Sequence, residues 1–219
     1  MKLLLTSSGL ANQSIANALF ELVGKKPEDT SLVFIPTAAN VRIGDKDWFI
    51  EDLLKLKKQH FKSIDIADIS ALDEDIWRRK FETADILFFE GGSVYHLMNW
   101  INKSGLISLL PELLKTKVYV GSSAGSMVTS KDLALKMHSA EHEGKDEKIE
   151  NIPCLNFVDF YILPHLNSEH FPLRTEEYVK QAAQDIPDTI YALDDNSALK
   201  IVDGKVEVIS EGKWFVINE

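Results

Sequence analysis

Short apolar runs alternate with longer amphipathic runs along most of the chain, which is the pattern of βαβ units around a parallel sheet. The short runs have no polar alternation, as expected for strands that helices cover on both faces. The pattern predicts strands at Leu3–Thr6, Leu32–Ile35, Ile64–Asp68, Ile86–Phe89, Val118–Gly121 and Phe160–Leu163. It predicts helices at Asn12–Val23, Asp47–His60, Asp73–Thr83, Val94–Leu114 (broken near Gly105), Ala124–Ser130 and Thr175–Gln184.

The pattern changes toward the end of the chain, where short β-like runs follow one another closely. They lie at Thr189–Ala192, Leu199–Val202, Val206–Ile209 and Trp214–Ile217, and Asp203-Gly204 suits a tight hairpin turn between two of them. We therefore predict an α/β fold with a mostly parallel sheet, helices on both faces and a C-terminal antiparallel β extension. The polar stretch Ser139–Glu150 is the best candidate for a surface loop.

Composition and charge narrow the class of protein. The 219 residues are 45% hydrophobic and 26% charged, which is globular and fits a single domain over residues 1–219. The formal net charge of -10 argues against nucleic-acid and anionic-membrane binding. The single cysteine, Cys154, excludes an intrachain disulfide, and the apolar start of the chain is too short for a signal sequence. These features favour a cytoplasmic protein.

The segment that carries chemistry is Gly121-Ser122-Ser123-Ala124-Gly125, a G-x-S-x-G pattern between a predicted strand and a predicted helix. In this context the pattern predicts a nucleophile elbow, a sharp turn that projects its central side chain above the sheet. Small flanking residues allow such a turn to close. Ser123 holds the central position, so we take it, and not Ser122, as the candidate nucleophile. The pattern also occurs by chance at helix starts, so it needs support from a base.

His165 is the candidate base, because it follows an apolar strand and Pro164, at the sheet edge where α/β proteins bind ligands. His170 is the second choice. Asp194 and Asp195 follow a later strand and are candidates for the acid that orients the histidine, although one of them is expected to serve the turn. The order Ser, His, Asp differs from the order in α/β-hydrolases and makes that fold less probable.

Gly91-Gly92 follows the strand at Ile86–Phe89 and can bring backbone N–H groups close to an anion, or can be a simple turn. The sequence has neither a P-loop nor a G-x-G-x-x-G motif, so nucleotide binding has no support. His, Cys and Asp show no metal-site spacing. We therefore expect neither a cofactor nor a metal.

These motifs, in this order, resemble peptidase family S51, which includes dipeptidase E and cyanophycinase. The resemblance rests on Glu90-Gly91-Gly92, the Ser123 pentapeptide, Pro164-His165-Leu166-Asn167 and Ala192-Leu193-Asp194-Asp195, and it spans nearly the whole chain. It implies a fold like class I glutamine amidotransferases, with serine in place of the cysteine nucleophile. It also implies that Ser123 is the nucleophile, His165 the base and Asp195 the acid. The N–H groups of Gly92 and Ala124 would form the oxyanion hole.

The resemblance also implies a substrate class, dipeptides that begin with aspartate. Such a substrate needs a cation, and Arg174 is the candidate, with a salt bridge or cap on the following helix as the alternative. Ser93 stands where family members commonly carry Asn, which leaves substrate preference open.

We therefore expect a serine exopeptidase that acts on short peptides. The alternatives are an esterase or amidase acting on small molecules and a non-catalytic binding module that retains the elbow. A small peptide is the expected partner, and the sequence leaves a homodimer open.

Overall fold

The structure of the protein is a computed structural model. It describes residues 1–133, 152–184 and 186–218. The predicted surface loop at Ser139–Glu150 lies outside the described residues.

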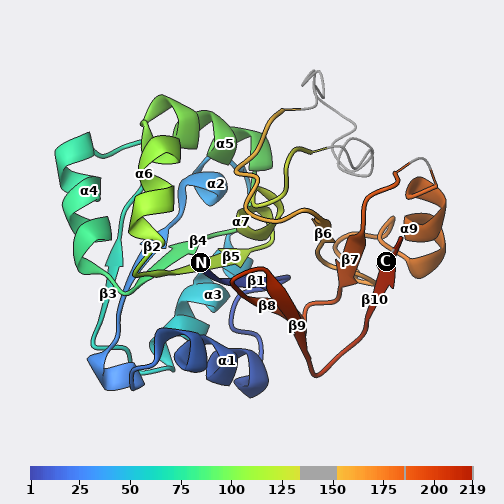
Figure 1. Ribbon diagram of the computed structural model, residues 1–219, viewed down its shortest axis with the longest axis horizontal. Coiled ribbons are helices and arrows are strands. Elements are labelled where there is room, and N and C mark those ends of the chain that lie inside the picture. Colours follow the sequence, from blue (N-terminus) through green and yellow to red (C-terminus); the bar gives the residue numbers. More distant parts are fainter. Residues whose placement is uncertain (134–151, 185, 219) are drawn as a thin grey trace.

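A seven-stranded sheet forms the centre of the fold (Figure 1). Five strands are parallel and have the order β3-β2-β4-β5-β1, and two antiparallel strands, β8 and β9, extend the sheet beyond β1. The strands are β1 (Lys2–Thr6), β2 (Ser31–Ile35), β3 (Ser63–Ile66), β4 (Ile86–Phe89), β5 (Val118–Ser122), β8 (Ser197–Val202) and β9 (Lys205–Ser210). The carboxyl ends of β4, β5 and β1 therefore meet at one edge of the sheet, where α/β folds place ligands.

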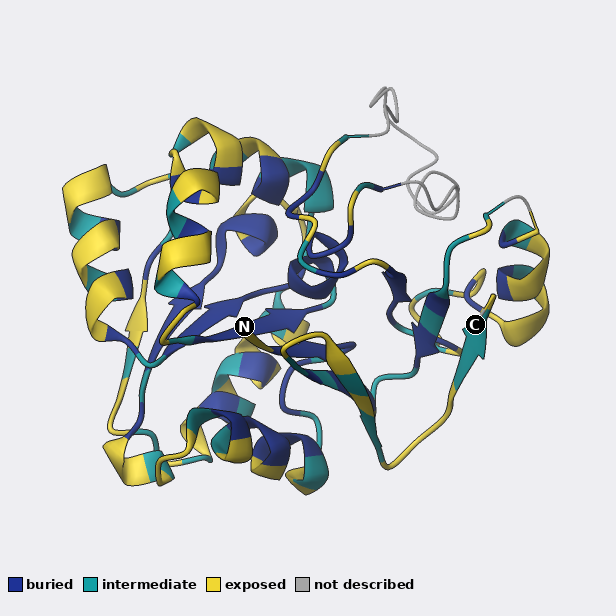
Figure 2. Cartoon of the chain, viewed as in Figure 1, coloured by how far each residue is buried: buried dark blue, intermediate teal, exposed yellow. Residues whose placement is uncertain are grey.

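Helices cover both faces of this sheet, as the apolar runs predicted (Figures 1 and 2). Leu3 and Leu5 pack with the helices of one face, whereas Leu4 packs with those of the other, because successive strand residues point to opposite faces. The first face carries α4 (Glu74–Thr83), α5 (Val94–Lys103), α6 (Leu106–Leu113) and α7 (Ala124–Met127). The second carries α1 (Gln13–Val23) and α3 (Asp47–Lys57). The predicted break near Gly105 is confirmed, because α5 and α6 are separate helices and Gly105 has a φ of 75°.

Within residues 1–133, 152–184 and 186–218, two short elements were not predicted, the 3-10 turn η1 (Pro27–Asp29) and helix α2 (Thr37–Asn40). Both are shorter than the runs that hydrophobic periodicity can detect. Helix α2 follows β2 directly and lies at the same edge of the sheet as the glycine pair, since Ser93 N–H donates to the Ala38 carbonyl.

A second, three-stranded sheet lies beside the first (Figure 1, right). Its order is β10-β7-β6, with β6 parallel and β10 antiparallel to β7. The elements are β6 (Tyr161–Leu163), α9 (Glu176–Ala182), β7 (Ile190–Leu193) and β10 (Trp214–Ile217), and their apolar side chains form a separate cluster. The antiparallel extension is therefore divided: the β8–β9 hairpin joins the main sheet, and β10 joins the second. The run predicted at Phe160–Leu163 also belongs to the second sheet, because β8 occupies the edge beside β1.

Among the described residues, no helix is long and apolar enough to cross a membrane. Exposed side chains lie mainly on the outer helix surfaces, and the central strands are buried (Figure 2).

Candidate active site

Ser123 occupies a strained turn between β5 and α7. Its φ of 47° and ψ of -106° lie outside the regions that residues other than glycine usually adopt. Strand β5 ends at Ser122, which pairs with Thr6 of β1, and α7 begins at Ala124. Ser122 is buried within the strand, whereas Ser123 is partly exposed. The predicted nucleophile elbow thus has the expected strand–turn–helix geometry around Ser123.

Neighbouring groups hold the elbow in this conformation. The Ser123 N–H donates to the Thr6 carbonyl at 3.0 Å, and the Tyr119 hydroxyl donates to the Gly125 carbonyl at 2.6 Å. A Cβ at Gly125 would collide with the backbone of Phe89, so the glycine is required by close approach of two backbone segments. The turn is therefore fixed before any ligand binds.

His165 reaches Ser123 from the second sheet. It follows β6 and Pro164, and its φ of 63° turns the ring back toward the main sheet. Its Nε2 lies 2.8 Å from Ser123 Oγ, and its Nδ1 lies 2.6 Å from Asp195 Oδ1. An ionised carboxylate only accepts hydrogen bonds, so Nδ1 carries the proton and Nε2 accepts from the Ser123 hydroxyl. His170, the second-choice base, is exposed.

The two adjacent acids have different surroundings. The Asp194 carboxylate accepts hydrogen bonds from the backbone N–H groups of Asn196 and Lys213 and from the Ser197 hydroxyl. These contacts make Asp194 a turn cap. Asp195, by contrast, faces His165. The structure thus brings Ser123, His165 and Asp195 together and leaves Asp194 outside the constellation.

Ser7 is a member of this cluster that the sequence did not reveal. It follows β1 and is fully buried. The Ser7 hydroxyl donates to Asp195 Oδ1 at 2.8 Å, and Ser7 Oγ accepts the backbone N–H of His165, also at 2.8 Å. The sequence signal for Ser7 was its position directly after a predicted strand. Ser8 beside it is equally polar, so the sequence does not show which of the two serines joins the site. Ser7 links the main sheet to both His165 and Asp195.

These contacts decide the charge of Asp195. Burial alone would raise the pKa of its carboxyl, but the hydrogen bond and charge of His165, the Ser7 hydroxyl and the positive charge of Lys55 together hold the pKa below its ordinary value. The carboxyl is therefore ionised at neutral pH, as an acid that stabilises an imidazolium must be.

The glycine pair lies against the nucleophile. A Cβ at Gly91 would stand 3.2 Å from the Ser123 Cβ, and a Cβ at Gly92, whose φ is 135°, would collide with the Ala38 carbonyl. Within the described part of the chain, the N–H groups of Gly92 and Ala124 donate to no protein acceptor. N–H groups without a protein acceptor are available to bind a ligand, as the predicted oxyanion hole requires.

Arg174 is buried near the histidine, with 4% of its surface exposed. Its Nη1 donates to the Pro164 carbonyl at 2.7 Å, and its guanidinium lies 4.2 Å from the centre of the Phe171 ring. The same ring stacks on His165, with 4.5 Å between the ring centres. The helix after Arg174 is capped by the Thr175 side chain, which accepts from Tyr178 N–H. Arg174 therefore contacts Phe171, and Phe171 in turn contacts His165 of the candidate triad.

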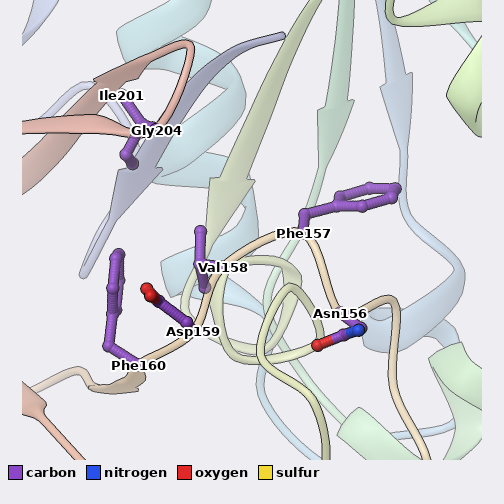
Figure 3. A pocket seen from close by; sticks show the side chains of 7 residues that line it. All are labelled: Asn156, Phe157, Val158, Asp159, Phe160, Ile201 and Gly204. Carbon is purple, nitrogen blue, oxygen red and sulfur yellow. The ribbon is translucent and has the colours of Figure 1, made fainter.

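A cavity of about 310 Å³ lies elsewhere in the fold (Figure 3). Its walls are residues 156–160 on one side and Ile201 and Gly204 of the β8–β9 hairpin on the other. Asp203 beside Gly204 bonds to Met1, so this cavity is at the amino end of β1, away from Ser123. Asp159 is its one ionisable lining residue, and we assign the cavity no catalytic role. Among the described residues, no group of three or more His, Cys, Asp or Glu side chains could hold a metal ion.

Comparison with known proteins identifies the family of this chain. The sequence model of peptidase family S51 matches residues 3–209. The chain belongs to peptidase family S51. This S51 member is a serine peptidase, and the curated relatives that it matches are named as peptidases. An uncharacterized peptidase of Listeria innocua is 26% identical over 81% of this chain and 87% of that protein. One of Listeria monocytogenes is 28% identical over 83% and 85% of the two chains.

Solved structures support the fold of the S51 peptidase. A candidate peptidase E protein from Listeria monocytogenes EGD-e superposes with a TM-score of 0.79, at 24% identity, over 96% of this chain and 98% of that one. A peptidase from an acI-B1 Actinobacterium gives a TM-score of 0.67 at 18% identity, over 99% and 93% of the two chains. The predicted α/β fold of the class I glutamine amidotransferase type is confirmed.

Proposed function

We propose that this S51 peptidase hydrolyses short peptides, in particular dipeptides with an N-terminal aspartate, through an acyl-enzyme on Ser123. One observation carries the proposal: the continuous hydrogen-bonded series from Ser123 Oγ through the His165 ring to Asp195, with separations of 2.8 and 2.6 Å. A serine hydroxyl is a weak nucleophile on its own, and such a series is how serine hydrolases activate it.

The proposed reaction has two stages. In the first, Ser123 Oγ attacks the scissile carbonyl carbon while His165 Nε2 takes the hydroxyl proton, and the N–H groups of Gly92 and Ala124 bind the oxyanion. His165 then gives this proton to the leaving amine as the C–N bond breaks. In the second stage, His165 takes a proton from water, the hydroxide attacks the ester, and the proton returns to Ser123 as the acid product leaves. Asp195 stabilises the imidazolium in both stages.

The aspartate preference requires a cation near the substrate. Arg174 is the proposed residue, and its contact with Phe171, whose ring stacks on His165, supports the proposal. A guanidinium suits a carboxylate because its N–H groups can bond both oxygens. The alternative, an esterase or amidase acting on small molecules, uses the same triad and differs only in substrate.

A substrate panel tests the proposal. Wild type, Ser123→Ala and the neighbouring control Ser122→Ala are assayed on aspartyl dipeptides, isoaspartyl dipeptides and simple esters. We expect hydrolysis of aspartyl dipeptides by wild type and by Ser122→Ala, and none by Ser123→Ala, whose circular dichroism stays unchanged. Turnover by Ser123→Ala at the wild-type rate would refute the nucleophile. Hydrolysis of esters alone would refute the peptide substrate and leave the triad in place.

A further inference from the structure

A buried carboxyl group lies directly beneath the glycine pair. Glu90 is 1% exposed and stands between β4 and Gly91. Its Oε1 accepts the Gly91 N–H at 2.7 Å. Its Oε2 is buried and receives no hydrogen bond from the described residues. A buried carboxylate oxygen without a donor is costly, so this atom needs an explanation.

The explanation is a second carboxyl group facing it. Asp52 of α3 is 6% exposed and pairs with Lys55 at 2.7 Å. Asp52 and Lys55 are the charged groups whose influence reaches the Glu90 carboxyl. Two carboxylates cannot donate to one another, but a protonated carboxyl donates to an ionised one. A single proton on Glu90 would therefore satisfy Oε2, provided that Oε2 carries it toward Asp52.

Electrostatics favour the protonated form of Glu90. Burial, and then the negative charge of Asp52 close by, raise the pKa of Glu90 well above its ordinary value, although the Gly91 N–H and the Lys55 charge act in the opposite direction. Lys55 neutralises the ionised Asp52 in the same cluster.

We propose that Glu90 is a positioning residue that works as a neutral carboxylic acid. Its protonated oxygen donates to Asp52, and its other oxygen holds the Gly91 N–H, so the pair ties the glycine turn to α3. The turn is the one that lies against Ser123 and offers the Gly92 N–H, so its position sets one oxyanion donor. The inference rests on the proposed role of Ser123. It predicts that ionisation of Glu90 at alkaline pH places two negative charges together and displaces the turn.

The rate at which a fluorophosphonate labels Ser123 provides the test, because this probe uses the nucleophile and the oxyanion hole and has no titrating amine. Glu90→Gln keeps a neutral group that can accept from Gly91 and donate to Asp52. We expect it to label at close to the wild-type rate at neutral pH and to lack the alkaline fall that wild type shows. Glu90→Ala should be about tenfold or more slower, since small displacements of a catalytic group have effects of this size. Glu51→Gln is the control, an exposed acid beside Asp52 on α3.

Two results would overturn the inference: Glu90→Gln as slow as Glu90→Ala, or wild type and Glu90→Gln with the same pH profile. If Glu90→Ala does not fold, Asp52→Asn replaces it. In this variant ionised Glu90 no longer faces a second negative charge, so the alkaline fall must disappear.

Infrared spectroscopy separates this inference from the proposed function. A protonated carboxylic acid has a carbonyl band distinct from that of carboxylates. We expect this band at neutral pH in wild type and Glu51→Gln and its loss in Glu90→Gln. If the wild type has the band and its alkaline titration but Ser123 is not labelled, the proposed function fails and the neutral carboxyl stands. If the wild type lacks the band while Ser123 is labelled, the inference fails and the proposed function stands.

Discussion

Replacing Ser7 with alanine removes one hydroxyl that serves two partners. The oxygen accepts the His165 backbone N–H and donates to Asp195, both at 2.8 Å. His165 has a φ of 63°, an uncommon conformation for a residue other than glycine, so its backbone depends on such contacts. The substitution therefore removes a contact that positions His165 and a contact that positions Asp195. We expect the distance between His165 Nε2 and Ser123 Oγ to change most.

The expected size of the effect follows from these two bonds. A buried N–H left without an acceptor costs about 1–3 kcal/mol. The Asp195 side chain is 42% exposed, so solvent weakens the second bond, and we take about 1 kcal/mol for it. A total of about 2–4 kcal/mol corresponds to a fall in Tm of about 4–16 °C for a chain of this length. Disabling a triad acid lowers kcat about 10⁴-fold. Asp195 keeps its bond to His165, so we expect a smaller loss of about 10–100-fold.

The stability effect should depend on pH. The pKa of Asp195 is lowered in the folded protein, so its contribution is present above the unfolded pKa, which is about 3.9, and is lost as pH falls through the folded pKa. Ser7→Ala removes one of the bonds that lower this pKa. The part of the stability difference that comes from Asp195 is therefore full at neutral pH and disappears in acid, once the carboxyl is protonated in both proteins.

The assay compares Ser7→Ala with Ser8→Ala by thermal unfolding at neutral and acidic pH and by the rate of fluorophosphonate labelling. Ser8 is the matched control because it is the next residue and its hydroxyl makes no hydrogen bond to the described part of the chain. If Ser7→Ala and Ser8→Ala have the same Tm and the same labelling rate, the bridging role of Ser7 is refuted.

Three further predictions concern residues around the site. Asp195→Asn should slow labelling of Ser123 strongly and should also lower Tm at neutral pH, because the ionised carboxylate stabilises the fold there. Asp194→Asn should lower Tm through the lost turn contacts and leave labelling closer to wild type; strong slowing of labelling by Asp194→Asn instead of Asp195→Asn would exchange the two roles. Arg174→Lys should raise KM for aspartyl dipeptides more than it lowers kcat, while a fall in kcat alone would make Arg174 a positioning residue for His165. Burial, and then the Asp132 charge, raise the pKa of Cys154 to about 12, so iodoacetamide should neither modify it in the folded protein nor reduce activity.

The sequence predicted most of the main sheet because its strands are continuous apolar runs. β4 has the predicted bounds, and β1 and β5 each differ by one residue. The elbow was also predictable, because a strand followed by G-x-S-x-G and small residues has few other conformations. These signals are local, so one sequence is enough to read them.

The sequence could not show which strand belongs to which sheet, since this depends on pairing between strands that are far apart along the chain. The runs that became β6 and β7 have the apolar character of main-sheet strands, yet they pair only with each other and with β10 among the described strands. The strand that takes the free edge of β1 is β8, whose Lys200 pairs in register with Leu4. For the same reason Asp194 and Asp195 could not be separated. Their roles depend on Lys213 and His165, which lie far away in sequence.

The candidate triad is assembled from two pairs of parallel strands whose carboxyl ends face each other. β1 and β5 supply Ser7 and Ser123, and β6 and β7 lead to His165 and Asp195. After Asp195 the chain enters β8, which pairs with β1, so the acid lies where the second sheet is joined covalently to the first. Because each sheet supplies only part of the site, the nucleophile and base stay within hydrogen-bonding distance only while the two sheets keep their relative position. Ser7 is the one side chain that bonds both the His165 backbone and the Asp195 carboxylate among the described residues. Its hydroxyl therefore couples the packing of the two sheets to the chemistry of Ser123.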